Sequence, residues 1–207
     1  HALEPVFVPP QETVDAFLPP YAPKHRLDTQ APESWGNVVS QDMYCRHRQD
    51  IGAAMGQVAA LTAAADMEWC ELTGRSFGVV ERYRCEAAHT VIVTMGSMSG
   101  TARDAVDALR EAGQAVGLLK VRLFRPLPVQ ELIAALAGVP EVLVLDRNYS
   151  PGHGGILHQE LRAALYGMVD APRIHGYLAG VGGVNVSPEK IAVFVRRARA
   201  SEAQPHS

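Results

Sequence analysis

The second half of the chain alternates short apolar runs with amphipathic segments. The run 90–95 (TVIVTM) is rich in apolar and β-branched residues, as strands buried on both faces of a parallel sheet are. Parallel strands joined through helices require right-handed crossovers, so this alternation predicts a mostly parallel sheet of about five strands with helices on both faces. The expected strands are 79–83, 90–95, 116–124, 141–145 and 173–178, and the expected helices are 101–111, 129–137, 156–166 and a last helix capped by Ser187. The sequence therefore predicts a three-layer α/β/α domain.

Residues 1–47 are expected to form an extended arm. Prolines at positions 5, 9, 10, 19, 20, 23 and 32 interrupt strand ladders and long helices, and only residues 12–18 are expected to form a short helical turn. Aromatic residues such as Phe7, Phe17 and Trp35 favour burial. We therefore expect the arm to wrap over a neighbouring domain or subunit. The alternative is a disordered tail, although such tails contain few aromatic residues.

Residues 48–73 are expected to form one long helix. Their apolar positions recur at alternating steps of four and three, which places one side chain after another on the same helical face: Ile51, Met55, Val58, Thr62, Ala65, Trp69 and Leu72. Gly74 supplies a C-terminal stop. The predicted organisation is an arm (1–47), a bridging helix (48–75), an α/β domain (76–200) and a short tail (201–207).

Charge and cysteine content argue against several function classes. The formal net charge is -3, which argues against a surface for nucleic acid or anionic membranes. No apolar run approaches the roughly 20 residues of a membrane span, and no signal peptide is recognisable at the start of the sequence. The three cysteines, Cys45, Cys70 and Cys85, lack the CxxC spacing of zinc sites and are one thiolate short of a four-iron cluster. Free thiols without a disulfide framework favour a cytoplasmic protein.

Two glycine-rich turns before predicted helices are the candidate binding sites, because backbone amides at the start of a helix can bind an anion. The turn 96–101 lacks the lysine of a P-loop and the third glycine of a dinucleotide fingerprint. The turn 150–155 is expected to contact a ligand phosphate or another subunit. The alternative for both is a tight turn that packs closely on a neighbouring element. The candidate contacts are Ser97, Gly100 and Thr101 in the first turn, and Gly152, His153, Gly154 and Gly155 in the second.

Neither a catalytic residue nor a metal ligand is predicted. Asp146 and Arg147 follow a predicted strand at the carboxyl edge of the sheet, where α/β proteins often bind ligands, and we expect them to form an ion pair that anchors the next loop. His153 and His158 are five residues apart and would point to different faces of a helix. The other histidines are scattered, and no Ser/His/Asp or Cys/His spacing stands out.

Several short runs occur in a characteristic order along nearly the whole chain. They are VTMGS (93–97) before Gly100 and Thr101, GLLKVRLFRPLP (117–128), LDRN (145–148), SPG (150–152) before Gly154 and Gly155, GVGG (180–183) and VSPE (186–189), with FLP (17–19), LD (27–28) and GR (74–75) in the first part. In this combination they resemble the C-terminal, transketolase-C-like part of the alpha subunit of pyruvate:ferredoxin oxidoreductases. The chain departs from that family at Val184 and Asn185, where the family tends to carry Arg and Asp.

The resemblance implies a role inside a larger enzyme. In that family thiamine diphosphate attacks a 2-oxoacid such as pyruvate, carbon dioxide leaves, coenzyme A takes the acyl group and electrons pass through iron–sulfur clusters to ferredoxin, or the reaction runs in reverse. The implied cofactors of the complex are thiamine diphosphate, magnesium, four-iron clusters and coenzyme A, and none is assigned to this chain. The implied partners are a pyrimidine-binding domain of the same subunit, the beta, gamma and delta subunits, and ferredoxin. We therefore expect a non-catalytic part of a longer subunit.

Two other interpretations stay open at this point. The second interpretation is the equivalent domain of another thiamine enzyme, such as a transketolase, a deoxyxylulose-phosphate synthase or a 2-oxoacid dehydrogenase. Against it, Asp146-Arg147 stands where those enzymes usually carry an acidic pair. A free-standing interaction module without chemistry is the third interpretation. It would have a hydrophilic bridging helix, which Met55, Trp69 and Leu72 do not suit.

Overall fold

A computed structural model describes residues 5–36 and 38–200 of the chain. Residues 6–76 form one compact unit, and the residues from Phe77 onward form the main part of the other. The expected tail at 201–207 and the first four residues lie outside the described part. Among the described helices, none is long and apolar enough to cross a membrane.

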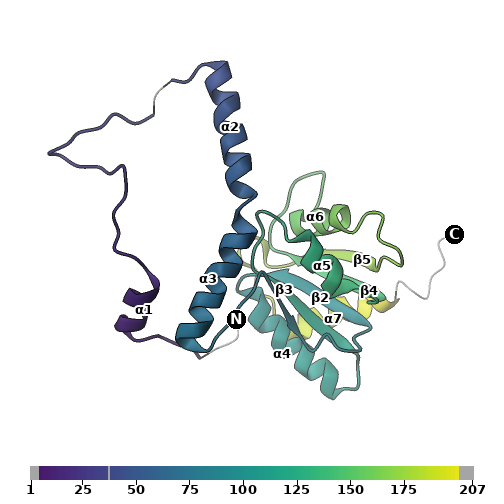
Figure 1. Cartoon of the computed structure of the whole chain (residues 1–207). Helices are drawn as coiled ribbons and strands as arrows, with labels where there is room; N and C mark the ends of the chain where they lie inside the picture. The colour runs from purple at the N-terminus through teal and green to yellow at the C-terminus, as the bar shows by residue number, and fades with distance from the viewer. Residues whose placement is uncertain (1–4, 37, 201–207) are drawn as a thin grey trace. The chain divides into compact units, whose positions relative to one another are not determined.

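The unit that begins at Phe77 is built on one five-stranded sheet in the order β1-β3-β2-β4-β5. Strands β2 to β5 run parallel, and β1 pairs antiparallel with β3 at one edge. The strands are β1 (Val80–Tyr83), β2 (Thr90–Met95), β3 (Val116–Val121), β4 (Glu141–Asp146) and β5 (Arg173–Leu178), and the helices are α4 (Met98–Glu111), α5 (Val129–Leu136), α6 (Ile156–Ala164) and α7 (Pro188–Ala200), with a 3-10 turn η1 (Val181–Gly183). The predicted α/β fold with a mostly parallel sheet is confirmed (Figure 1).

The sheet is covered by two helices on each face, which gives three layers. Side chains of α5 and α6, such as Leu132 and Leu161, share one core cluster with Val91 and Val142. Helices α4 and α7 share the other cluster with the opposite face of the same strands, where Ile92 and Leu143 are fully buried. Each buried Val, Leu or Ile side chain stabilises the fold by about 1.5–3 kcal/mol relative to exposure. The continuous apolar runs of β2 and β4 therefore reflect burial on both faces.

Three element boundaries in this unit differ from the sequence-based expectation by two residues or more. Helix α4 begins at Met98 instead of residue 101, so Gly100 and Thr101 lie inside its first turns. Strand β3 ends at Val121 instead of residue 124, because the amides of Arg122 and Leu123 both bond to the carbonyl of Val79, before the start of β1. Helix α6 ends at Ala164 instead of residue 166.

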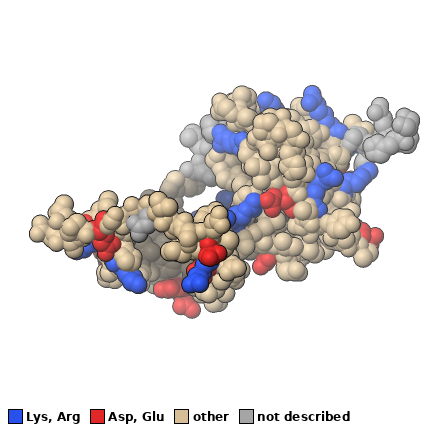
Figure 2. All heavy atoms as spheres, turned by 90° about the horizontal axis from the view of Figure 1, so that it is seen from above, with Lys and Arg blue, Asp and Glu red and all other residues tan. Residues whose placement is uncertain are grey.

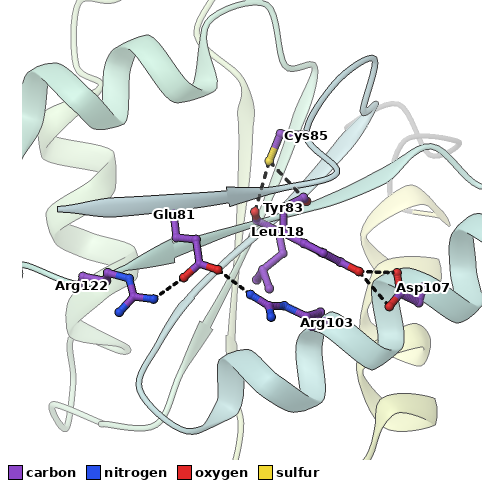
Figure 3. A network of polar contacts seen from close by, with 7 residues as sticks. All are labelled: Glu81, Tyr83, Cys85, Arg103, Asp107, Leu118 and Arg122. Atoms are coloured by element: carbon purple, nitrogen blue, oxygen red, sulfur yellow. Dashed lines mark hydrogen bonds and ion pairs between the residues drawn. The ribbon is translucent and has the colours of Figure 1, made fainter. Parts of the chain in front are cut away.

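Polar contacts hold the short edge strand β1 against α4 and the end of β3. Figure 3 shows the Glu81 carboxylate between Arg103 of α4 and Arg122, which both donate to it, and Tyr83 donating to Asp107 of α4 at 2.9 Å. Burial alone would raise the pKa of Glu81, but the hydrogen bond and charge of Arg122 and the charge of Arg103 outweigh it and lower this pKa below its usual value. These contacts fix a four-residue strand that has little apolar area of its own.

The unit formed by residues 6–76 contains α1 (Gln11–Phe17), α2 (Gln41–Met55) and α3 (Val58–Thr73). The prediction of one helix over 48–73 is wrong in two respects. The helix begins earlier, because the Ser40 hydroxyl caps it by accepting from the Met43 amide at 3.4 Å. It is also interrupted at Gly56, a poor helix former, where the Gln57 amide bonds to Ala54 three residues back instead of four. The stop at Gly74 is confirmed: this residue is left-handed with φ +69 and its amide bonds to Cys70.

Apolar side chains of this unit are largely exposed. Helix α1 packs on α3 through an edge-to-face contact of Phe17 with Trp69, whose ring centroids are 5.1 Å apart. None of the three helices contains a buried residue. The large apolar residues exposed here are Val6, Phe7, Val8, Leu18, Tyr21, Leu27, Trp35, Val38, Val39, Met43, Tyr44, Ile51, Leu61, Met67 and Leu72. On the face that Figure 2 shows, charged residues of both signs are scattered between wide uncharged areas.

Candidate functional site

Strand β4 is followed by Arg147, whose guanidinium reaches the first glycine-rich turn. Its Nη1 donates to the Ser97 hydroxyl at 3.0 Å, and its Nε donates to the Gly180 carbonyl at 3.4 Å. The three residues follow the carboxyl ends of β4, β2 and β5, so the parallel arrangement brings them together. A small cleft at this edge of the sheet is lined by Ser97, Met98, Thr101, Arg147, Val184, Asn185 and Val186.

The start of α4 faces this edge without a side-chain cap. The amide of Ser99 bonds to the Gly96 carbonyl at 3.2 Å, which closes the turn. Gly96 is left-handed with φ +67, so this position favours glycine. Ser97 and Thr101 line the cleft as predicted contacts of the first turn, whereas Gly100 lies in the helix and is not among the residues lining the cleft. The helix start and the neighbouring guanidinium give this edge a positive electrostatic character.

The start of α6 is capped by residues of its own chain. The Asp146 carboxylate accepts from the amides of Leu157 and His158, both at 2.9 Å, and the Asn148 side chain accepts from the amide of Ile156 at 2.8 Å. An internal carboxylate thus occupies the position that an anion would take at this helix start. Gly155 allows this contact, because a Cβ at that position would lie 2.1 Å from Asp146 Oδ2.

The expected ion pair between Asp146 and Arg147 is not what the structure shows. Successive residues of a strand point to opposite faces, so the two side chains leave β4 in different directions. Asp146, which is only 2% exposed, turns to the start of α6, and Arg147 turns to Ser97. The loop after β4 is thus anchored by the Asp146 cap at the start of α6, and not by an ion pair between Asp146 and Arg147.

The second glycine-rich turn is closed by its own backbone. Ser150 and Gly154 exchange two hydrogen bonds of 2.9 Å, and the His153 amide also bonds to Ser150. Gly152 and Gly154 are left-handed, with φ +79 and +98. The exposed His153 lines a shallow groove together with Ser150, Ile156, Gln159, Glu160 and Ala163. Of the candidate contacts, Ser97 and Thr101 therefore line one surface and His153 lines another.

A buried polar network lies where the parallel strands begin, at the end of the sheet opposite to Arg147. It has no counterpart in the sequence-based prediction. The fully buried Glu141 carboxylate accepts from the Thr90 hydroxyl at 2.7 Å, and His175 Nε2 lies 3.4 Å from its other oxygen. Arg199 of α7 donates to Thr90 at 3.2 Å and so ties the last helix to this network. The glutamate at the start of the apolar run 141–145 is the signal that could have indicated it.

The donors at this site are suited to an anion. Arg147, Ser97 and the amides at the start of α4 can donate hydrogen bonds to an anion. For the Ser97 hydroxyl to act as a nucleophile, an adjacent base would have to activate it. Within the described ranges, no group of three or more His, Cys, Asp or Glu side chains is arranged to hold a metal ion. Of the three free cysteines, Cys85 is buried, and burial raises the pKa of its thiol.

Comparison with known families identifies the fold unit. Residues 88–191 match the family described as pyruvate:ferredoxin oxidoreductase core domain II. The chain belongs to this family. The matched range contains β2 to β5, the Arg147–Ser97 contact and both glycine-rich turns of the core domain II fold.

Relatives extend the core domain II match to the first part of the chain. The pyruvate synthase subunit PorA of Methanothermobacter thermautotrophicus is 40% identical over 98% of this chain and 52% of its own length. The ketoisovalerate oxidoreductase subunit VorA of Pyrococcus horikoshii is 38% identical over 88% of this chain and 47% of its own length. The chain thus spans about half the length of these curated relatives. A solved 2-oxoglutarate:ferredoxin oxidoreductase from Magnetococcus marinus aligns with 67% of this chain and 23% of its own, with 24% identity and a TM-score of 0.47.

Proposed function

We propose that this chain is a non-catalytic, assembly-forming part of the alpha subunit of a 2-oxoacid:ferredoxin oxidoreductase. The observation that carries the proposal is the 40% identity to a pyruvate synthase subunit over 98% of the chain, which includes the arm as well as the core domain II fold. The proposed reaction of the whole enzyme converts pyruvate and coenzyme A to acetyl-CoA and carbon dioxide, with electrons passing to ferredoxin, or the reverse.

The 2-oxoacid is the first point that needs a test. Pyruvate is our choice because two pyruvate synthase subunits are 40% and 38% identical to this chain, and 2-oxoisovalerate is the second candidate because a ketoisovalerate oxidoreductase subunit is 38% identical to it. The two substrates differ in one apolar group, a methyl against an isopropyl, and hydrophobic pockets discriminate even a single methylene by about 10- to 200-fold.

Thiamine diphosphate with magnesium, four-iron clusters and coenzyme A are proposed for the complex and not for this chain. The cleft at the sheet edge offers the Arg147 guanidinium and the hydroxyls of Ser97 and Thr101, donors that suit an anion. When bound elsewhere in the complex, thiamine diphosphate supplies the carbanion chemistry. Ser97, Thr101 and Arg147 are proposed to hold an anionic group of a ligand or partner, whereas His153 and Gly152 to Gly155 are proposed as partner contacts.

The exposed apolar side chains of the first unit support an assembly role. Exposed residues such as Tyr21, Leu27 and Val38 are 91%, 92% and 100% accessible, and surfaces of this kind usually mark contacts with other proteins. We propose that residues 5–40 form an arm and that α2 and α3 form a helical bridge, and that both bury these side chains against a pyrimidine-binding domain of the same subunit and the beta, gamma and delta subunits. A cytoplasmic location is proposed because all three thiols are free.

The decisive experiment purifies the tagged full-length subunit from its native host without oxygen. We expect brown co-purifying subunits and viologen reduction that requires pyruvate, coenzyme A and thiamine diphosphate. Replacing pyruvate with 2-oxoisovalerate or 2-oxoglutarate ranks the substrates. A colourless, solitary protein without 2-oxoacid-dependent reduction would contradict the proposal.

A further inference from the structure

Strand β5 forms an open edge of the sheet. It pairs only with β4 among the described strands, and Figure 1 shows it at the end of the sheet beside α6. The amide of Arg173 bonds to Pro140 and the amide of Ala179 bonds to Asp146, so odd-numbered residues of β5 direct their backbone groups toward β4. Because backbone polar groups alternate along a strand, those of Ile174, Gly176 and Leu178 point away from the sheet.

The neighbouring helix lies close to this edge and leaves room for a further chain. The His158 ring packs against Gly176, where a Cβ would lie 2.5 Å from its Nδ1, and it hydrogen-bonds to the backbone of Ile174. The His158 ring therefore already occupies one of the outward backbone groups of Ile174. A groove follows the strand, and its lining includes His158 and Arg162 of α6 and Ile174, His175 and Gly176 of β5.

The side chains that line the groove favour a negatively charged ligand. Its lining contains one arginine and two histidines and no aspartate or glutamate. Arg162 is one helical turn after His158 and is exposed, so its charge is available to a ligand in the groove. Glu141 approaches the groove only behind His175, and its side chain is fully buried. A carboxylate on the occupant would thus meet a positive charge without a competing acid from the groove.

We propose that a partner polypeptide adds an extended segment to β5 as a sixth strand and places an Asp or Glu carboxylate on Arg162. Main-chain hydrogen bonds to the amide of Ile174 and to the outward groups of Gly176 and Leu178 supply the affinity, and the carboxylate supplies the specificity. A second copy of this chain fits less well, because pairing two β5 strands would bring two Arg162 side chains to the same interface. The inference rests on the proposed function, since it requires that the chain works in a multi-chain complex.

Amide hydrogen exchange tests the backbone part in the full-length subunit, free and in the purified complex. We expect the amides of Ile174, Gly176 and Leu178 to exchange at least tenfold more slowly in the complex, while those of His175 and Tyr177 are protected in both states. Equal exchange of the outward amides in both states overturns the proposal. Protection already present in the isolated subunit overturns it too, because the occupant would then belong to the same chain.

Arg162→Lys followed by carbodiimide coupling tests the carboxylate. A lysine at this position forms an amide bond with an adjacent carboxylate, and mass spectrometry of isotope-mixed complexes identifies its owner. We expect a cross-link to an Asp or Glu of another polypeptide, whereas a link within the chain, a link between two copies or no link overturns the proposal.

Two substitutions with matched controls complete the test. Leu178→Pro removes an outward amide from an edge strand, and Arg162→Glu reverses the charge; each is expected to weaken partner association at least tenfold. Leu178→Ala and Arg196→Glu, the latter on exposed α7 surface, are expected to leave association unchanged. An active wild-type complex with unaffected variants contradicts only this inference, whereas the absence of any complex contradicts the proposed function.

Discussion

Asp146 occupies the space that a side chain at position 155 would need. A Cβ on Gly155 would lie 2.1 Å from Oδ2 of Asp146 and 2.6 Å from its Cβ, so no rotation of the carboxylate alone relieves the overlap. The backbone of Gly155 has φ -74 and ψ 136, a conformation that any residue can adopt. Close packing alone therefore requires glycine here.

The first prediction follows from this contact. Gly155→Ala is expected to lower the free energy of unfolding by about 2 kcal/mol, because overpacking displaces the cap of α6. Thermal or urea unfolding measures the loss. Asp146→Ala alone removes the cap and is expected to cost about 1–2 kcal/mol. In the double variant the two losses should be clearly less than additive, and full additivity would contradict the proposed overlap.

The second prediction concerns Glu81. Its pKa is lower in the folded than in the unfolded chain, so its contribution to stability is present above the unfolded value near 4.5 and is lost as the pH falls through the lower, folded value. Glu81→Gln is expected to cost about 1 kcal/mol near neutral pH and progressively less below about pH 4. Unfolding curves over this pH range measure the difference. Glu111→Gln, an exposed change on α4, should show no such pH dependence.

The third prediction tests the positive edge at Arg147. Inorganic phosphate is expected to raise the melting temperature of the wild-type protein above that in chloride of equal ionic strength, because an anion bound only to the folded state stabilises it. Arg147→Met should abolish most of this increment, and Ser97→Ala should reduce it. Arg196→Met is the control. Equal increments in Arg147→Met and wild type would show that no anion binds at this edge.

The fourth prediction compares Gly52, which lies within α2, with Gly56, which follows its last residue. A Cβ at Gly52 meets no atom within 4 Å, whereas one at Gly56 lies 3.3 Å from the Ala53 carbonyl oxygen. Gly52→Ala is expected to stabilise the helix by about 0.5–1 kcal/mol, and Gly56→Ala by less. Circular dichroism during thermal unfolding measures both. A larger gain from Gly56→Ala would mean that the interruption between α2 and α3 is a matter of helix propensity and not of packing.

Sequence periodicity predicted the sheet well, because its signal is local. Strands β2 and β5 have the predicted bounds, and β4 extends the predicted range by one residue, Asp146. The interruption at Gly56 escaped prediction, since the apolar steps continue from Met55 to Val58 across it. The early start of α4 escaped as well, because Gly100 suggested a turn while tertiary packing buries Met98 and Ser99 in a helix.

The site was less predictable, because its partners are distant along the chain. Asp146 bonds to amides 11 and 12 residues later, and Arg147 bonds to Ser97, 50 residues earlier. The residue types at the ends of β2 and β4 were identified, but spacing alone does not specify which side chain turns to which helix. An acidic residue at a strand end, followed by a glycine-rich loop and a helix, is the pattern that would have indicated the cap.

The two edges of the sheet differ in a way that limits assembly. Strand β1 is short, runs antiparallel to β3 and is held in place by the contacts of Glu81 and Tyr83. It therefore offers a poor template for another strand. A chain with one closed and one open edge can accept a single added strand but cannot propagate a sheet from molecule to molecule. Such a polarity disfavours fibre formation and limits that interface to one added strand per chain.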